Sequence, residues 1–234
     1  MQTTDPWLML FDIDGTLVDT GGLGRVAFRR ALERVTGVDD DLAYVAFAGN
    51  TDLRVLDQVM ARRGRPLHET EVLRIFQSIA EELRHLLAAR PARMIPGADA
   101  FLERLAERGA ALGLVTGNIR ECAYIKLASV ELDHHFDFGG FGDDHPDRAH
   151  IARAALDAAR SGGHHPGRGP VCLVGDTLMD VAAGKALGLT VIGVATGHCS
   201  PHQLLEGGAD LVVEDFCNVP RLLEGIENAF GQGA

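Results

Sequence analysis

The sequence predicts an α/β protein: a parallel sheet forms its core, and a helical segment is inserted after the first strand. Short apolar runs alternate with helical patterns through most of the chain, which is typical of a parallel sheet covered on both faces. The alternation breaks once, between about residues 21 and 92, where only helical patterns occur.

Five short apolar runs are the expected strands. Three of them end in Asp or Thr with a Gly close by in the sequence, and ligands bind at the carboxyl ends of strands in such sheets. Two further segments repeat apolar residues at helical spacing and are expected helices. The expected strands are 7–12, 111–116, 171–176, 190–195 and 210–213, and the helices are 98–108 and 148–160.

The inserted segment contains three apolar stripes at helical spacing. We expect residues 21–93 to form a separate all-helical cap domain on two linkers, and residues 1–20 and 94–234 to form a discontinuous α/β core. The stripes are Phe28, Leu32 and Val35; Leu53, Leu56 and Met60; and Leu73, Phe76, Ala80, Leu83 and Leu87.

The composition limits the classes of molecule that we expect as the main binding partner. The formal net charge of −11 argues against nucleic acid or an anionic membrane surface as the main partner. No apolar run approaches the roughly 18 residues of a membrane span, and no signal peptide or CxxC pair is visible, so we expect a cytoplasmic protein. The sequence contains only two lysines, Lys126 and Lys185, so there are few candidates for a catalytic lysine.

The segment Phe11–Leu17 (FDIDGTL) carries the sharpest functional signal. Asp12 and Asp14 stand two residues apart at the end of a strand and can project toward the same side, and Gly15 allows a sharp turn. A turn preference explains Asp14 and Gly15 but not a second Asp ending an apolar strand. Two adjacent carboxylates repel each other, and a divalent cation would offset that repulsion.

A second acidic motif, GDTLMD, closes the 171–176 strand and opens a helix. Asp176 and Asp180 stand about one turn apart near the helix start, where either could simply cap the helix. Together with Asp12 and Asp14 they indicate a site of oxygen ligands for a hard cation, and Mg²⁺ is the usual choice beside phosphate.

The turn Thr116-Gly117-Asn118 follows the 111–116 strand. A hydroxyl and backbone N–H groups before a helix can bind an anion, although this sequence is also an ordinary strand-to-helix turn. Its place beside a metal site favours anion binding.

The ordered motifs DxDGT, a strand ending in Thr, and GDxxxD resemble the haloacid dehalogenase-like hydrolase superfamily over nearly the whole chain. The resemblance implies a Rossmann-like parallel sheet core with a helical cap. Gly49-Asn50-Thr51-Asp52 and Ile95-Pro96-Gly97 are similar to the phosphoglycolate phosphatase branch. Asn50, Thr51 and Asp52 are therefore the expected cap contacts to substrate.

The resemblance also implies roles. Asp12 would attack phosphorus and Asp14 would act as acid and then base. Asp12, Asp176 and the main-chain carbonyl of Asp14 would bind Mg²⁺, with support from Asp180. Thr116, helped by the backbone N–H groups of Gly117 and Asn118, would hold the phosphoryl group.

One position departs from the family pattern. The usual lysine before the last motif is absent, and Arg148, which opens the helix before the GDxxxD strand, is its expected replacement as a catalytic and phosphate-binding cation. Alternatively, Arg148 pairs with Asp144 or Asp147 on the surface.

The expected function is Mg²⁺-dependent hydrolysis of a small phosphorylated metabolite, such as phosphoglycolate, by a monomer or homodimer. A phosphomutase of the same fold and a non-catalytic binding protein remain alternatives. A dehalogenase is disfavoured, because carbon–halogen cleavage needs neither Mg²⁺ nor an acid for the leaving group.

Overall fold

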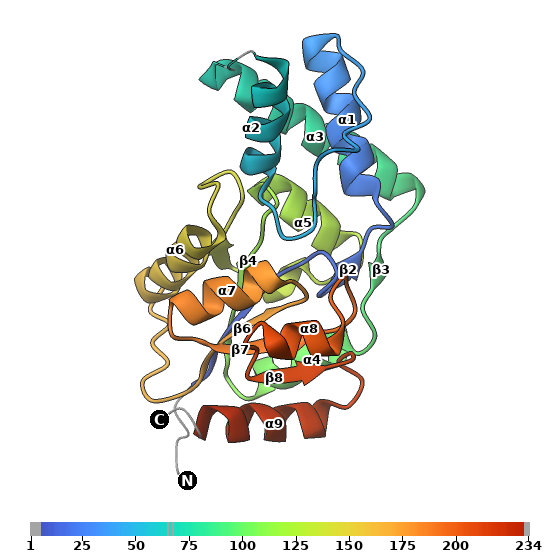
Figure 1. Ribbon diagram of the computed structural model, residues 1–234. Coiled ribbons are helices and arrows are strands. Elements are labelled where there is room, and N and C mark those ends of the chain that lie inside the picture. The colour runs from blue at the N-terminus through green and yellow to red at the C-terminus, as the bar shows by residue number, and fades with distance from the viewer. Residues whose placement is uncertain (1–5, 65, 67, 232–234) are drawn as a thin grey trace.

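A six-stranded, all-parallel sheet lies at the centre of the protein in this computed structural model (Figure 1). The structure describes residues 6–64, 66 and 68–231, so parts of the expected core (1–5, 232–234) and cap (65, 67) lie outside the described residues. The strand order is β5–β4–β1–β6–β7–β8. The strands are β1 (Leu8–Phe11), β4 (Ala111–Val115), β5 (Phe138–Gly140), β6 (Val171–Gly175), β7 (Thr190–Val194) and β8 (Leu211–Val213).

Helices cover both faces of this sheet, as the apolar strands predict. Because side chains alternate along a strand, Met9 and Phe11 of β1 join the core on one face, while Leu8 and Leu10 join the core on the other. One face is covered by α4 (Ala98–Glu107), α5 (Arg120–Ala128) and α9 (Val219–Gly231), and the other by α6 (Arg148–Ser161), α7 (Leu178–Ala186) and α8 (Pro201–Glu206).

The residues between β2 (Val18–Asp19) and β3 (Arg93–Met94) form a helical region with its own hydrophobic core (Figure 1). Its helices are α1 (Leu23–Thr36), α2 (Asp52–Arg63) and α3 (Glu69–Ala89). The three predicted stripes lie on these helices and are largely buried, although Leu73 is 55% exposed. Ile119 and Cys122, at the start of α5, also pack into this core and connect it to the sheet domain.

The predicted strands and helices are confirmed, each within a residue or two of the observed bounds. Three short strands were not predicted. β5 has only three residues, two of them glycine, and so lacks a strand-like pattern. The other two, β2 (Val18–Asp19) and β3 (Arg93–Met94), pair antiparallel where the chain leaves and re-enters the sheet domain.

Candidate active site

Three neighbouring strand ends bring the polar motifs together. The central strand β1 pairs with β4 on one side and β6 on the other, so Asp12, Thr116 and Asp176 follow adjacent strands at the same edge. The Asp12 backbone N–H donates to the Val174 carbonyl at 2.9 Å, which extends the pairing up to the site. All three side chains are buried.

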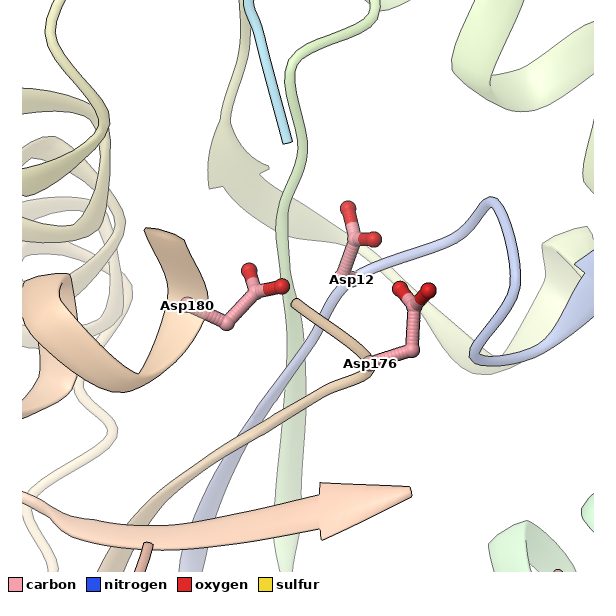
Figure 2. Close-up of side chains that lie close together, drawn as sticks. All are labelled: Asp12, Asp176 and Asp180. Atoms are coloured by element: carbon pink, nitrogen blue, oxygen red, sulfur yellow. The ribbon is translucent and has the colours of Figure 1, made fainter. Parts of the chain in front are cut away.

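Asp12, Asp176 and Asp180 form a buried carboxylate cluster, in which the three side chains lie close together and Asp180 extends toward Asp12 (Figure 2). One carboxylate oxygen from each lies within 4.8 Å of the others. Asp180 also completes the start of α7, because its carboxylate accepts hydrogen bonds from the backbone N–H and hydroxyl of Thr177 at 3.1 and 2.6 Å. Asp180 therefore caps the helix and belongs to the cluster at once.

Two glycines make room for the Asp176 carboxylate. A Cβ at Gly15 would lie 2.5 Å from Asp176 Oδ2, and a Cβ at Gly197 would lie 1.6 Å from the same oxygen. Gly15 also has a φ of 79°, the left-handed conformation that the sharp turn after Asp14 requires. Any side chain at these two positions would displace the carboxylate.

The cluster is electrostatically unfavourable without a cation. Burial, reinforced by the charges of neighbouring carboxylates, raises the pKa of Asp12 to about 7 and that of Asp176 to about 8. Closely spaced carboxylate oxygens that resist ionisation alone are the donor set that a hard divalent cation stabilises. The residues present thus fit a metal site of the Mg²⁺ type.

Arg148 is the buried cation of this cluster. Its Nη2 lies 2.5 Å from Asp12 Oδ1 and its Nε lies 2.6 Å from Asp180 Oδ1, with only 3% of the side chain exposed. The surface alternative is wrong, since Asp147 instead caps α6 and pairs with a histidine, and Asp144 accepts from the Phe141 backbone. Arg148 is thus a buried partner of two of the three carboxylates.

The turn after β4 presents a hydroxyl with its acceptor lone pairs occupied. Thr116 Oγ1 accepts from the Asn118 backbone N–H at 3.2 Å and from Asn118 Nδ2 at 2.7 Å, which directs its own hydrogen elsewhere. The Asn118 N–H therefore already has an acceptor within the turn, whereas the family resemblance implied that this N–H would help to hold the phosphoryl group. Among the described residues, the Gly117 N–H has no backbone acceptor.

Asp14 contacts a lysine that the sequence analysis missed. Lys126 Nζ lies 2.5 Å from Asp14 Oδ2 and 2.5 Å from Asn118 Oδ1, and Asn118 Nδ2 donates to the same Asp14 oxygen at 2.7 Å. The lysine side chain is 5% exposed, whereas that of Asp14 is 43% exposed. The available signal was a lysine on the otherwise apolar face of α5, beside Cys122 and Leu127.

A cavity of about 630 Å³ opens over these groups, between the sheet domain and the helical region. The strand-end residues and Lys126 form its polar wall. Phe28, Phe47, Ile79 and Leu83 contribute an apolar wall from the helical region. The cavity can hold a small molecule with one charged end over the carboxylates.

The start of α2 joins the helical region to the loops of the site. The Asp52 N–H donates to the Gly117 carbonyl at 2.7 Å, and the Leu53 N–H donates to the Gly142 carbonyl at 3.3 Å. The Asp52 carboxylate accepts from the Ile119 N–H at 2.9 Å, and burial raises its pKa to about 6. This docking contact was not foreseen from the sequence.

The three residues expected to contact substrate divide between docking and the cavity. Thr51 caps α2 and its hydroxyl donates to the Pro146 carbonyl at 3.3 Å, on the sheet domain. Asn50 Nδ2 donates to the Ala46 carbonyl at 2.6 Å. Asn50 and Asp52 line the cavity, and Thr51 is buried behind them.

The parallel sheet and the acidic centre at its edge are consistent with a hydrolase, and sequence comparison identifies the family. The family model of haloacid dehalogenase-like hydrolases matches residues 9–194, and the chain belongs to this family. A probable phosphatase IndB of Dickeya dadantii is 28% identical, covering 91% of each chain. A phosphoglycolate phosphatase of Agrobacterium fabrum is 29% identical, covering 93% of this chain and 92% of its own.

Solved structures share the fold. A putative β-phosphoglucomutase from Bacteroides vulgatus superposes with a TM-score of 0.69 at 23% identity, covering 98% of this chain and 92% of its own. A mutant of CbbY from Rhodobacter sphaeroides, in complex with xylulose-1,5-bisphosphate, gives 0.69 at 22% identity, covering 94% and 98%. These two likenesses show that the chain shares the fold of both structures.

In the part of the chain that the structure describes, Asp12, Asp176 and Asp180 are the one group of three or more His, Cys, Asp or Glu side chains close enough to share a metal ion. Within the same residues, no helix combines the length and apolar character of a membrane span.

Proposed function

We propose that this protein is a Mg²⁺-dependent phosphatase that hydrolyses a small phosphate monoester through an aspartyl-phosphate on Asp12. The observation that supports this most directly is the position of Asp12, at the end of the central strand, between the strand ends that carry Asp176 and Thr116. We also propose that residues 21–93 act as a cap over the core of residues 1–20 and 94–234.

The first half of the reaction transfers the phosphoryl group to the protein. An Asp12 oxygen attacks phosphorus, the bond from phosphorus to the ester oxygen breaks, and Asp14 gives a proton to the departing alkoxide. The Thr116 hydroxyl and the Gly117 N–H hold phosphoryl oxygens, and Arg148 orients Asp12 through its 2.5 Å contact.

The second half releases phosphate. Asp14 takes a proton from water, the oxygen of that water attacks phosphorus, and the bond to Asp12 breaks, which restores the carboxylate. Mg²⁺ held by Asp12, Asp176 and the Asp14 main-chain carbonyl, with Asp180 in support, would neutralise the charge of the phosphoryl oxygens.

The substrate we propose is phosphoglycolate or a close analogue, as the name of the Agrobacterium fabrum relative suggests. A phosphomutase is the second candidate, because the Bacteroides vulgatus structure carries that name. The non-catalytic alternative rested on the missing lysine. Two buried cations beside Asp12 and Asp14 weaken that argument, since they supply positive charge where the chemistry needs it.

The test is hydrolysis of p-nitrophenyl phosphate by wild type and Asp12→Asn, each with Mg²⁺ and with EDTA. We expect activity that requires both the metal and Asp12. Asp157→Asn, which changes an exposed carboxylate paired with Arg160 on α6, is the matched control and should retain full activity. Glucose 1-phosphate, assayed for isomerisation, tests the mutase. If wild type and Asp12→Asn are equally inert toward a panel of phosphorylated metabolites, the proposal is wrong.

A further inference from the structure

Lys126 is a buried cation in the cavity to which the proposed mechanism gives no role. An ammonium group has three N–H donors. Two of them are engaged, with Asp14 Oδ2 and Asn118 Oδ1, each at 2.5 Å. Among the described residues, the third has no further hydrogen-bond partner. A buried lysine with an unassigned donor on a cavity wall can bind a ligand.

The space beside the ammonium group is kept open by a glycine. Gly24, on α1 of the helical region, lines the same cavity as Lys126. A Cβ at Gly24 would lie 3.6 Å from Lys126 Nζ, so the nearest wall of the helical region presents backbone without a side chain. A small group in the cavity can therefore approach Nζ from this side.

The arginines of the cavity are engaged elsewhere. Arg148 is bound to the carboxylates of Asp12 and Asp180. The guanidinium of Arg25 donates to the Leu42 and Val45 carbonyls at 3.3 and 2.9 Å, and it also lies 4.7 Å from a phenylalanine ring centroid. Of the lysine and arginine side chains that line the cavity, Lys126 is the one whose charge faces the place of the leaving group.

The distance to Asp14 limits which group of a substrate can reach Lys126. In the proposed function, Asp14 hydrogen-bonds the ester oxygen of the leaving group, and Nζ is 2.5 Å from the Asp14 carboxylate. A second anionic oxygen must then lie close to the ester oxygen. A carboxylate on the carbon that bears the ester oxygen meets this condition, because its oxygens lie about 3 Å from that oxygen.

We propose that Lys126 binds a carboxylate on the leaving group, so that the site selects phosphate esters of 2-hydroxy carboxylic acids. This inference rests on the proposed function and assigns the residue that recognises its substrate. A lysine that served only as the counter-ion of Asp14 would act on every phosphate ester alike. Under this proposal, Lys126 favours only the phosphate esters whose leaving group carries the carboxylate.

The experiment compares two substrates of equal carbon count, phosphoglycolate and ethyl phosphate, which differ in the carboxylate. We expect wild type with Mg²⁺ to favour phosphoglycolate in kcat/KM by on the order of 10² or more, because a site built around a polar group rejects the analogue that lacks its partner. In Lys126→Met this preference should fall below about tenfold, with the loss for phosphoglycolate mainly in KM.

Lys185→Met is the matched control. It removes the other lysine of the chain, which is partly exposed and pairs with Asp210 on the surface, and it should leave the preference unchanged. Any general damage to Asp14 in Lys126→Met lowers both substrates by the same factor and cancels in the ratio. Lys126→Gln, which keeps a hydrogen-bond donor without the charge, serves if the methionine variant does not fold, and it should also lose the preference.

Each outcome decides between the two proposals. A wild-type ratio near one, or a ratio unchanged in the Lys126 variants, overturns the role of Lys126, while hydrolysis of p-nitrophenyl phosphate leaves the phosphatase standing. Wild type inert toward all three esters overturns the proposed function, and the role of Lys126 with it.

Discussion

Replacing Arg148 by methionine removes the one positive charge that the described chain places within the carboxylate cluster. The Asp12 and Asp180 side chains, which are 7% and 0% exposed, then lose their 2.5 and 2.6 Å partner. Removing one member of a buried ion pair costs about 3–5 kcal/mol, since the remaining charge is left uncompensated. In a chain of this length, that corresponds to a fall in melting temperature of about 10 °C.

The assay is thermal unfolding at pH 8 in EDTA and in Mg²⁺. We expect most of the loss in EDTA and a smaller one in Mg²⁺, because the cation compensates the same carboxylates. The loss should also shrink at pH 5, where carboxyl groups with raised pKa values take up protons instead of ionising.

Arg104→Met is the control. Arg104 pairs with Glu107 on the surface, with side chains 55% and 63% exposed, and its loss should cost less than about 1 kcal/mol. If Arg148→Met in EDTA is as stable as Arg104→Met, the carboxylates do not depend on Arg148 and the electrostatic account of the cluster is wrong.

Two further predictions concern the contact between α2 and the site. Burial raises the Asp52 pKa from 3.8 to about 6, so folded Asp52 binds protons that the unfolded chain has released and stability falls as pH rises through this window. The free energy of unfolding of Asp52→Asn minus that of wild type, measured in urea, should therefore rise by at most about 3 kcal/mol from pH 4 to pH 7. A difference that does not change with pH would contradict this. Gly117→Ala would place a Cβ 2.0 Å from the Asn50 carbonyl oxygen, and we expect kcat/KM to fall by on the order of 10²-fold with a loss of about 1–3 kcal/mol in stability. Gly162→Ala, whose Cβ meets only ordinary or slightly tight neighbours at 3.3 Å or more, should change neither, and equal behaviour of the two variants would refute the steric argument.

The sheet and the acidic centre could be predicted because both follow from local pattern. Apolar runs ending in Asp or Thr identify strands, and the parallel order then places Asp12, Thr116 and Asp176 at one edge without knowledge of the packing. Arg148 could be predicted as well, since it opens the helix before β6.

The parts that could not be predicted depend on contacts between distant segments. Lys126 belongs to a helix face that packs inward, and a lysine in such a pattern gives no sign that a carboxylate 112 residues away will meet it. The Asp52 contact likewise depends on how the helical region docks against the turn after β4. β5 was missed because its pairing with β4, rather than its own residues, makes it a strand.

Two backbone hydrogen bonds, from the Asp52 N–H to the Gly117 carbonyl and from the Leu53 N–H to the Gly142 carbonyl, connect the start of α2 to the loops that follow β4 and β5. If the helical region, which we propose to act as a cap, moved away from these loops, both bonds would break and the turn that carries Thr116 would lose its bond to Asp52. Under the proposed function, the turn would therefore be braced for the reaction only while the helical region is docked against it.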